Sequence, residues 1–261
     1  MKSEIILIAR PGAGIKIKNN SLVSNANFDV SLFNEMLAKN GVAIEPLFGV
    51  NEEQLLAEIG FYESQGVAIP NLSVFYRIEV PPSHAEEIFQ ALSSMNFIEN
   101  VYVKPPAEPA WLDIPDTNMK ADDATYVPDI TPDFSVHQIY LEEAPIGVDA
   151  KYAWGIIGGN GSGITLADIE SGWNFSHEDL VHNKLGVIYG SNADNPNDRI
   201  HGTDVIGVLG GDNNEIGIKG ICHGASIAAI AVTDNDYINT SKAIKWAADY
   251  LKPGDILILE L

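Results

Sequence analysis

Hydrophobic residues recur with two spacings in the first hundred residues of the chain. Apolar positions that alternate with polar ones, as in LSVFYRIEVP, predict strands, whereas apolar positions three or four residues apart predict helices. A capping box of Ser83 and Glu86 is expected to open the last of these helices. The two strand–helix–strand passages predict a small α+β sandwich of the split-βαβ, ferredoxin-like type for residues 1–104. Strands are expected at 3–9, 42–49, 72–81 and 98–105, and helices at 29–41, 51–66 and 83–95.

The pattern changes twice further along the chain. Residues 105–135 hold many prolines and acids without sustained periodicity, which predicts an extended linker that a protease could reach. From residue 136 onward, strongly apolar strands alternate with helices, which predicts a parallel sheet covered on both faces. Strands are expected at 164–169, 184–190, 225–232 and 254–261, and helices at 148–156, 202–211 and 240–251.

The composition favours a folded protein and argues against two classes of partner. Apolar residues make up 46% of the 261 residues, and the net charge is −21. Nucleic acids and anionic membranes are disfavoured as partners because phosphate binding needs clustered Lys and Arg. The single cysteine, Cys222, excludes an internal disulfide. The apolar run near the N-terminus is too short for the core of a signal peptide, which leaves the location open between a cytoplasmic and a non-classically exported protein.

The glycine-rich stretch at 158–163 does not fit a phosphate-binding loop. It follows a predicted helix and precedes a strand, whereas a dinucleotide fingerprint needs the opposite order. It is therefore expected to be a tight surface connection. No Cys/His spacing suits zinc, so no metal ligand is assigned and no cofactor is expected to be required. The acidic loops at 192–198 and 211–215 offer oxygen ligands that leave a structural calcium ion open.

Two acids stand at the end of the apolar strand predicted at 164–169. Asp168 and Glu170 are two residues apart, so both side chains face the same side of a sheet. Open α/β sheets place their active sites at the carboxyl ends of the strands. His201 follows at the expected start of the next helix. A carboxylate beside an imidazole is the acid–base half of a nucleophilic triad, in which the ring accepts the proton of the nucleophile.

These motifs, in this order, resemble those of the subtilisin-like serine peptidases (subtilases). IESGWNFSHEDL (169–180) is similar to the family's Asp-Ser/Thr-Gly strand end and His-Pro-Asp-Leu loop, and HGTDVIGVLGG (201–211) to its His-Gly-Thr-His helix. The segments at 217–232, 243–250 and 255–261 resemble the strand, helix and strand that follow in the family. The resemblance covers residues 136–261. More weakly, residues 1–104 resemble the inhibitory propeptide of such enzymes.

The resemblance implies a fold and an activity. It implies an α/β, parallel-sheet subtilisin-like catalytic domain, incomplete in this chain, that hydrolyses peptide bonds through an acyl-serine. Polypeptides would be the substrates. The propeptide-like domain would dock on the catalytic domain to form a zymogen, and autocatalytic cleavage would release it.

Departures from the family pattern concern the acid and a second histidine. Registering on Ser171-Gly172 places Glu170 at the family's acid position, and Asp168 is the alternative partner of His201. Asp204 replaces the second histidine of the family motif and is expected to be structural. His177, in the SHEDL loop, is also expected to be structural.

The last departure concerns the nucleophile. The serines after His201 are Ser226 and Ser241, and neither has the Gly-Thr-Ser-Met-Ala type of context that the family uses. This chain alone is therefore expected to be inactive. The serine would lie beyond residue 261, on a missing or separate polypeptide that forms the C-terminal part of the same protease. The alternative is a non-catalytic, subtilase-like binding or regulatory module.

Overall fold

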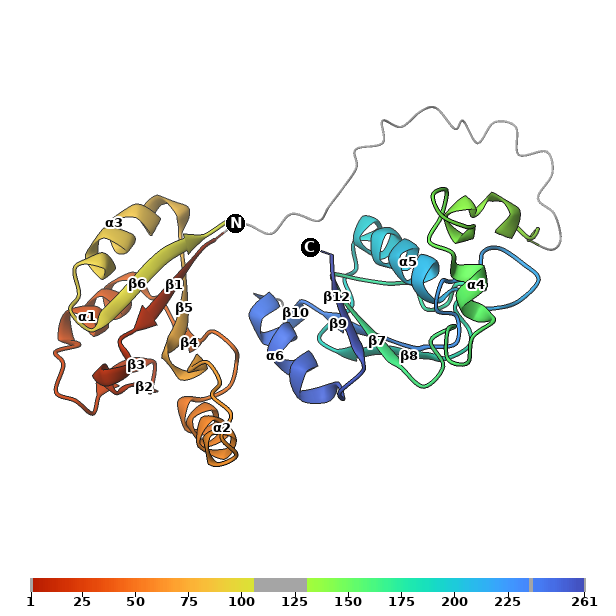
Figure 1. Cartoon of the computed structure of the whole chain (residues 1–261). Helices are drawn as coiled ribbons and strands as arrows, with labels where there is room; N and C mark the ends of the chain where they lie inside the picture. Colours follow the sequence, from red (N-terminus) through yellow and green to blue (C-terminus); the bar gives the residue numbers. More distant parts are fainter. Residues whose placement is uncertain (1, 106–130, 235–236, 261) are drawn as a thin grey trace. The chain divides into compact units, whose positions relative to one another are not determined.

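The computed structural model describes residues 2–105, 131–234 and 237–260. The chain divides into two compact units, 1–107 and 108–261 (Figure 1). Most of the predicted linker, residues 106–130, lies outside the described residues. None of the described helices combines the length and the apolar character needed to cross a bilayer.

The first unit is an α+β sandwich built on a four-stranded antiparallel sheet. The strands lie in the order β4-β5-β1-β6, with α1 between β1 and β4, α2 between β4 and β5, and α3 between β5 and β6 along the chain. Its strands and helices are β1 (Ser3–Ala9), α1 (Ser31–Asn40), β4 (Ile44–Pro46), α2 (Glu52–Ser64), β5 (Phe75–Val80), α3 (Pro82–Ser93) and β6 (Ile98–Lys104).

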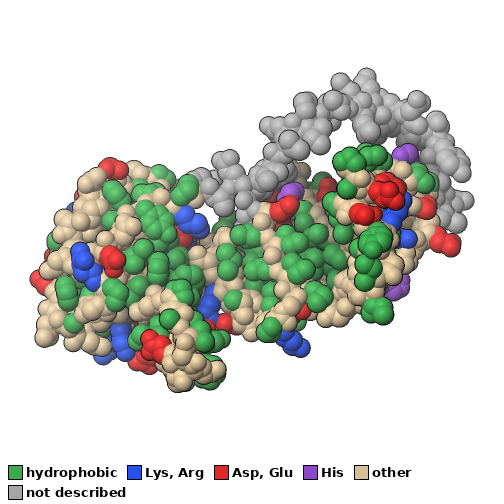
Figure 2. Space-filling view, in the orientation of Figure 1, with side chains coloured by type: hydrophobic (Ala, Val, Ile, Leu, Met, Phe, Trp, Pro, Cys, Tyr) green, Lys and Arg blue, Asp and Glu red, His purple; other side chains and the backbone are tan. Residues whose placement is uncertain are grey.

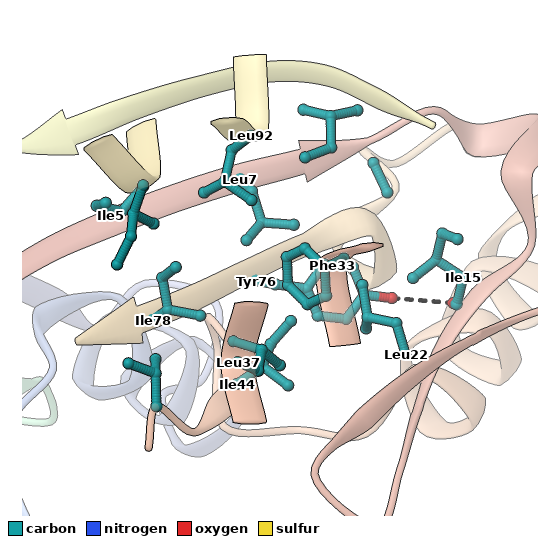
Figure 3. Close-up of a cluster of buried hydrophobic side chains, with 14 of the residues drawn as sticks. Ile5, Leu7, Ile15, Leu22, Phe33, Leu37, Ile44, Tyr76, Ile78 and Leu92 are labelled. Atoms are coloured by element: carbon teal, nitrogen blue, oxygen red, sulfur yellow. Dashed lines mark hydrogen bonds between the residues drawn. The ribbon is translucent and has the colours of Figure 1, made fainter. Parts of the chain in front are cut away.

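One face of this sheet carries the core of the first unit (Figure 3). Alternate residues of β1 and β5, among them Leu7 and Tyr76, pack against apolar side chains of α1 and α3 such as Phe33 and Leu92. The buried Tyr76 hydroxyl donates a 2.9 Å hydrogen bond to the carbonyl oxygen of Ile15, which satisfies its polar group inside the core. The alternation in LSVFYRIEVP therefore predicted the buried face of β5 correctly.

Two local features of this unit differ from the sequence-based prediction. The structure contains a hairpin of β2 (Ile15–Lys18) and β3 (Ser21–Ser24), for which no prediction was made. The capping box does not form, because α3 begins at Pro82 and its N-cap, Pro81, has no capping side chain. Proline is pre-organised for the first helical position, so the helix starts one residue before Ser83.

The second unit contains the parallel sheet predicted from the apolar strands. The strand order is β12-β7-β9-β8, and every neighbouring pair is parallel. The elements are α4 (Ala150–Trp154), β7 (Thr165–Glu170), β8 (Lys184–Tyr189), α5 (Pro196–Gly210), β9 (Ser226–Ala231), α6 (Thr240–Tyr250) and β12 (Ile256–Leu259), with a small ribbon of β10 (Thr233–Asp234) and β11 (Tyr237–Ile238).

Helices cover both faces of the sheet, which confirms the predicted α/β class. Helices α5 and α6 lie on opposite sides of the sheet (Figure 1). Ile206 of α5 packs on the face that carries Leu166 and Ile227, whereas Ala243 and Ala247 of α6 pack on the opposite face. Leu166, Asp168 and Glu170 alternate along β7 on the same side. Both acids therefore point toward the layer that contains α5.

Helix α5 begins six residues earlier than the sequence predicted. Asn195 caps it by accepting a hydrogen bond from the amide of Asn197, and Pro196 occupies the first turn. His201 consequently lies in the second turn of α5, not at the start of the helix. The acidic character of residues 192–198 suggested a loop and concealed this cap.

Candidate active site

Glu170 and His201 meet at the carboxyl end of β7. His201 Nε2 lies 2.9 Å from Glu170 Oε1, a contact with the distance of a hydrogen bond but without its alignment. The Glu170 side chain is 2% exposed, and that of His201 is 21% exposed. In a serine-protease triad the acid holds Nδ1 and Nε2 faces the serine. The imidazole ring of His201 is therefore turned the opposite way in this structure.

Asp168, the alternative acid, contacts a different side chain. The indole Nε1 of Trp173 donates a 2.7 Å hydrogen bond to Asp168 Oδ2, and both side chains are fully buried. The structure thus places Glu170 against His201 and uses Asp168 to hold the tryptophan of the turn that follows β7. Among the described residues, Asp168 Oδ1 accepts no hydrogen bond.

Both acids have raised pKa values. Burial raises the pKa of Asp168 to about 7, and the charges of Glu170 and Glu260 act in the same direction against the bond from Trp173. Burial also raises the pKa of Glu170 to about 7; the charge of Glu260 adds to the effect, and the backbone bond from Ser171 opposes it. Burial thus disfavours the charged form of the acid that contacts His201.

The two residues after His201 fix helix α5 against the strand end. A Cβ atom on Gly202 would lie 2.3 Å from the carbonyl oxygen of Gly172 and 3.0 Å from the Trp173 ring. Only glycine allows this close approach. The hydroxyl of Thr203 accepts a 2.9 Å hydrogen bond from the amide of Asn174. The HGT motif therefore combines an imidazole with two residues that hold it beside the acid.

Two further residues shape the site, and neither was predicted from the sequence as a site residue. Asn192 accepts a 2.8 Å hydrogen bond from the Trp173 amide and donates a 2.9 Å bond to its carbonyl oxygen, which fixes the turn after β7. Glu260 Oε2 lies 3.8 Å from His201 Nε2. A sequence signal for Glu260 existed, because the apolar strands ITLADI and DILIL both run directly into a glutamate.

The other predicted residues lie away from the acid–base contact. His177 Nδ1 accepts a 3.2 Å bond from the Asp179 amide within its own turn, and Asp204 is exposed on α5. Ser226 is aligned with Thr165 at the start of β7, five residues and about 16 Å from Glu170.

Ser241, the second serine after His201, also lies away from Glu170 and His201, and one of the loops predicted to offer calcium ligands uses its carboxylate for other contacts. Ser241 belongs to α6, which covers the opposite face of the sheet. The carboxylate of Asp212, in the loop at 211–215, binds Lys184 at 2.9 Å and the amides of Val181 and His182. The structural calcium ion stays a prediction.

Comparison with known proteins identifies the part of the chain that carries this site. Residues 161–258 match the model of the subtilase family. This similarity covers the strand end, the turn and the helix that carry Glu170 and His201. The chain is 32% identical over 116 residues to subtilisin E of Bacillus subtilis (strain 168) and to subtilisin J of Geobacillus stearothermophilus, in matches that cover 41% of this chain. The match spans about a third (30%) of the length of each of these curated relatives.

A solved structure is also similar to the chain. Fervidolysin from Fervidobacterium pennivorans, described as a keratinolytic enzyme related to subtilisin, aligns with 96% of this chain and 34% of its own chain. The TM-score is 0.42 and the sequence identity 17%.

Proposed function

We propose that this chain supplies the acid and the base of a subtilisin-type serine endopeptidase. The observation that carries the proposal is the 2.9 Å contact between Glu170 and His201, within the segment that matches the subtilase family. Glu170 is the acid, and His201 is the base. Asp168 is a positioning residue that acts through Trp173.

The proposed reaction hydrolyses a peptide bond through an acyl-serine. His201 accepts the proton of the serine hydroxyl as the serine oxygen attacks the carbonyl carbon, and the ring then donates that proton to the leaving amine. Glu170 stabilises the imidazolium formed between these steps. For Nε2 to face the serine, the ring turns about its Cβ–Cγ bond, a torsion with broad preferences. The serine comes from sequence beyond residue 261, on a missing or separate polypeptide.

The edge of the sheet suits such a completing segment. β12 lies at the end of the strand order, and three of its four residues, Ile256, Leu257 and Leu259, are 37–49% exposed. Figure 2 shows hydrophobic side chains gathered on the face of the second unit that is turned to the viewer. An added element would bury this surface, and it would approach the carboxyl end of the sheet where Glu170 and His201 lie.

The first unit is proposed to act as the propeptide of the enzyme. Its α+β sandwich, with the strand order β4-β5-β1-β6, and the sequence resemblance of residues 1–104 support this role. In this proposal the unit docks on the catalytic domain and keeps the zymogen inactive. Autocatalytic cleavage between residues 105 and 135 would release it.

Activity measurements with and without the completing segment test the proposal. The sequence that follows residue 261 in the natural gene is expressed with this chain, and hydrolysis of an internally quenched peptide is followed. Turnover and labelling by a fluorophosphonate probe are expected with the segment present, and neither with this chain alone. A natural gene that ends at residue 261 would overturn the placement of the serine.

Two substitutions assign the roles, and a third serves as their control. In subtilisin, loss of the histidine costs on the order of 10⁶ in kcat, and loss of the acid on the order of 10⁴. Losses of similar order are expected for His201→Ala and Glu170→Gln in the completed enzyme. Glu215→Gln, which removes an exposed carboxylate, should leave turnover unchanged. Full activity of His201→Ala would refute the assignment.

The second candidate function is a non-catalytic binding or regulatory module. The glutamate in place of the family's aspartate and the orientation of the His201 ring favour it. A completed protein that binds peptides but neither turns them over nor reacts with the fluorophosphonate probe would establish this alternative.

A further inference from the structure

Three side chains from three separate elements converge at the carboxyl end of β7. Glu170 ends β7, His201 lies on α5, and Glu260 follows β12. His201 Nε2 lies 2.9 Å from Glu170 Oε1 and 3.8 Å from Glu260 Oε2, and the three ligand atoms all lie within 4.8 Å of one another. Among the residues that the structure describes, this is the one group of three or more His, Cys, Asp or Glu side chains with such spacing.

The spacing fits one small cation. Zinc binds imidazole nitrogen and carboxylate oxygen at about 2.0–2.2 Å, so two ligand atoms of a tetrahedral site lie about 3.3–3.5 Å apart. The observed separations of 2.9 and 3.8 Å lie on either side of this value. Shifts of about half an ångström would bring both imidazole–carboxylate separations to this value. The two carboxylate oxygens, which lie within 4.8 Å of each other, would have to approach by at most about 1.4 Å (4.8 − 3.4).

A second observation points to a ligand at the same place. Glu170 is 2% exposed, and its buried Oε1 atom, which faces His201, accepts no hydrogen bond from any described residue. A buried carboxylate oxygen without a donor is costly, and a cation would compensate it. Glu260 is 49% exposed, which provides an entry path for an ion from solvent.

We infer that Glu170, His201 and Glu260 form a binding site for a divalent transition-metal ion of the Zn²⁺ class. One imidazole with two carboxylates favours such an ion over Ca²⁺, which takes only oxygen ligands. The two positive charges of the ion balance the two carboxylates. Three protein ligands also leave a fourth position for water, as in zinc sites that stay open.

Metal binding and peptidase chemistry exclude each other at this site. The nitrogen that contacts the carboxylates is Nε2, which must accept the serine proton in the proposed reaction. An ion on Nε2 withholds the base, so bound metal would inhibit the completed enzyme reversibly. This inhibitory effect rests on the proposed function, whereas the metal binding itself does not.

Direct titration of the full 261-residue chain tests the site without any need for activity. Zn²⁺ binding is measured by calorimetry, and Co²⁺, whose visible absorption reports coordination, is used as a spectroscopic probe and displaced by Zn²⁺. One ion per chain is expected. Removing a direct ligand should weaken binding at least as much as the roughly 10–100-fold that loss of a second-shell partner costs.

Two variants and two matched controls locate the ion. Glu260→Gln should weaken Zn²⁺ binding by at least about tenfold, and His201→Asn should abolish the Co²⁺ absorption band. Glu215→Gln and His84→Asn remove the same side-chain types at exposed positions and should bind as the unchanged chain does. Because Glu260 is half-exposed, its variant is expected to fold normally, which circular dichroism checks.

The outcomes separate this site from the proposed function. Equal Zn²⁺ affinity of Glu260→Gln, His201→Asn and the unchanged chain would overturn the site, as would the absence of binding at millimolar Zn²⁺. A completed protein without peptidase activity that still binds Zn²⁺ through these residues would refute the function and leave the site standing. Undiminished turnover at saturating Zn²⁺ would overturn the inhibitory effect.

Discussion

Alanine in place of Gly202 is expected to separate the acid from the base. Gly202 follows His201 and faces the turn after β7, where an added Cβ atom would lie 2.3 Å from the Gly172 carbonyl oxygen and 3.0 Å from the Trp173 ring. The first neighbour is backbone and the second is a fully buried ring, so neither can move aside cheaply. Helix α5 must therefore move away from the end of β7.

The size of the movement and its energetic cost follow from these contacts. A carbon at 2.3 Å must retreat by at least 3.0 − 2.3 = 0.7 Å to reach the shortest contact that real Cβ atoms show. Overpacking of this kind costs about 1–3 kcal/mol, whereas alanine gains about 0.8–1 kcal/mol over glycine inside a helix. Because the added carbon clashes with backbone, its cost lies near the upper end of the overpacking range. The free energy of unfolding should therefore fall by about 1–2 kcal/mol, or roughly 2–8 °C in unfolding temperature.

A second glycine of the same helix provides the control. A Cβ atom on Gly207 would meet only Ile218 Cδ1, at 3.4 Å, so Gly207→Ala keeps the helix-propensity gain at little steric cost. Urea unfolding of both variants is followed by tryptophan fluorescence and circular dichroism. Gly202→Ala should unfold at lower urea than the unchanged chain, and Gly207→Ala at equal or higher urea. A Gly202→Ala chain as stable as Gly207→Ala would refute the close approach of α5.

Three further predictions concern the acids and their partners. Glu170→Asp withdraws the carboxylate by about one C–C bond length, roughly 1.5 Å. Because 1 Å of misplacement can cost about 10²-fold in rate, the kcat of the completed enzyme should fall, even though aspartate is the family's usual acid. A rise in kcat would contradict the observed contact. Trp173→Phe removes the donor of the 2.7 Å bond to Asp168 and should destabilise the chain by about 1–3 kcal/mol in urea unfolding; unchanged stability would mean that the bond contributes nothing. Asp212→Asn leaves the buried Lys184 without its counter-ion and should cost about 3–5 kcal/mol at pH 7. Burial raises the pKa of Asp212, but the bonds from Lys184 and two backbone amides outweigh burial, so the pKa is lowered in the folded protein. Because the folded pKa lies below the unfolded one, the stabilisation by Asp212 is complete above about pH 4 and is lost below it. The unfolding curves of the variant and the unchanged chain should therefore converge in acid, and a stability gap that persists there would contradict the assignment.

The succession of apolar and polar positions determined the architecture of each unit. Continuous apolar strands such as ASIAAIAV are typical of a parallel sheet buried on both faces, and helices do cover both faces of the second sheet. Alternation in LSVFYRIEVP likewise marked the buried face of β5. These predictions were confirmed because the periodicity of a helix or strand determines which of its own residues are buried.

Element boundaries and caps were less predictable from sequence. Ser83 and Glu86 have the spacing of a capping box, yet Pro82 starts α3 one residue earlier. Asn195 and Pro196 start α5 within a stretch whose acids suggested a loop. In both cases proline, which is pre-organised for the first turn, decided the boundary over the competing local signal.

The partners within the site were decided only by the tertiary structure. The sequence placed Asp168 and Glu170 on one face of a strand but left open which of them contacts His201. The close approach of α5 at Gly202 places the imidazole beside Glu170, while Trp173 binds Asp168. A contact between side chains of different elements depends on how those elements pack, which local periodicity does not encode.

The same reason explains why Glu260 was missed. It lies 59 residues after His201 along the chain, and it approaches the site because β12 pairs with β7 in parallel register, Leu259 opposite Ile169. The spacing rules for metal ligands apply to residues within one loop or helix, so a site assembled from two strands and a helix has no such signature. The sequence by itself determined the strands, their apolar character and the acids at their ends; the pairing of those strands, and the helix packed across them, decided which acids share one imidazole.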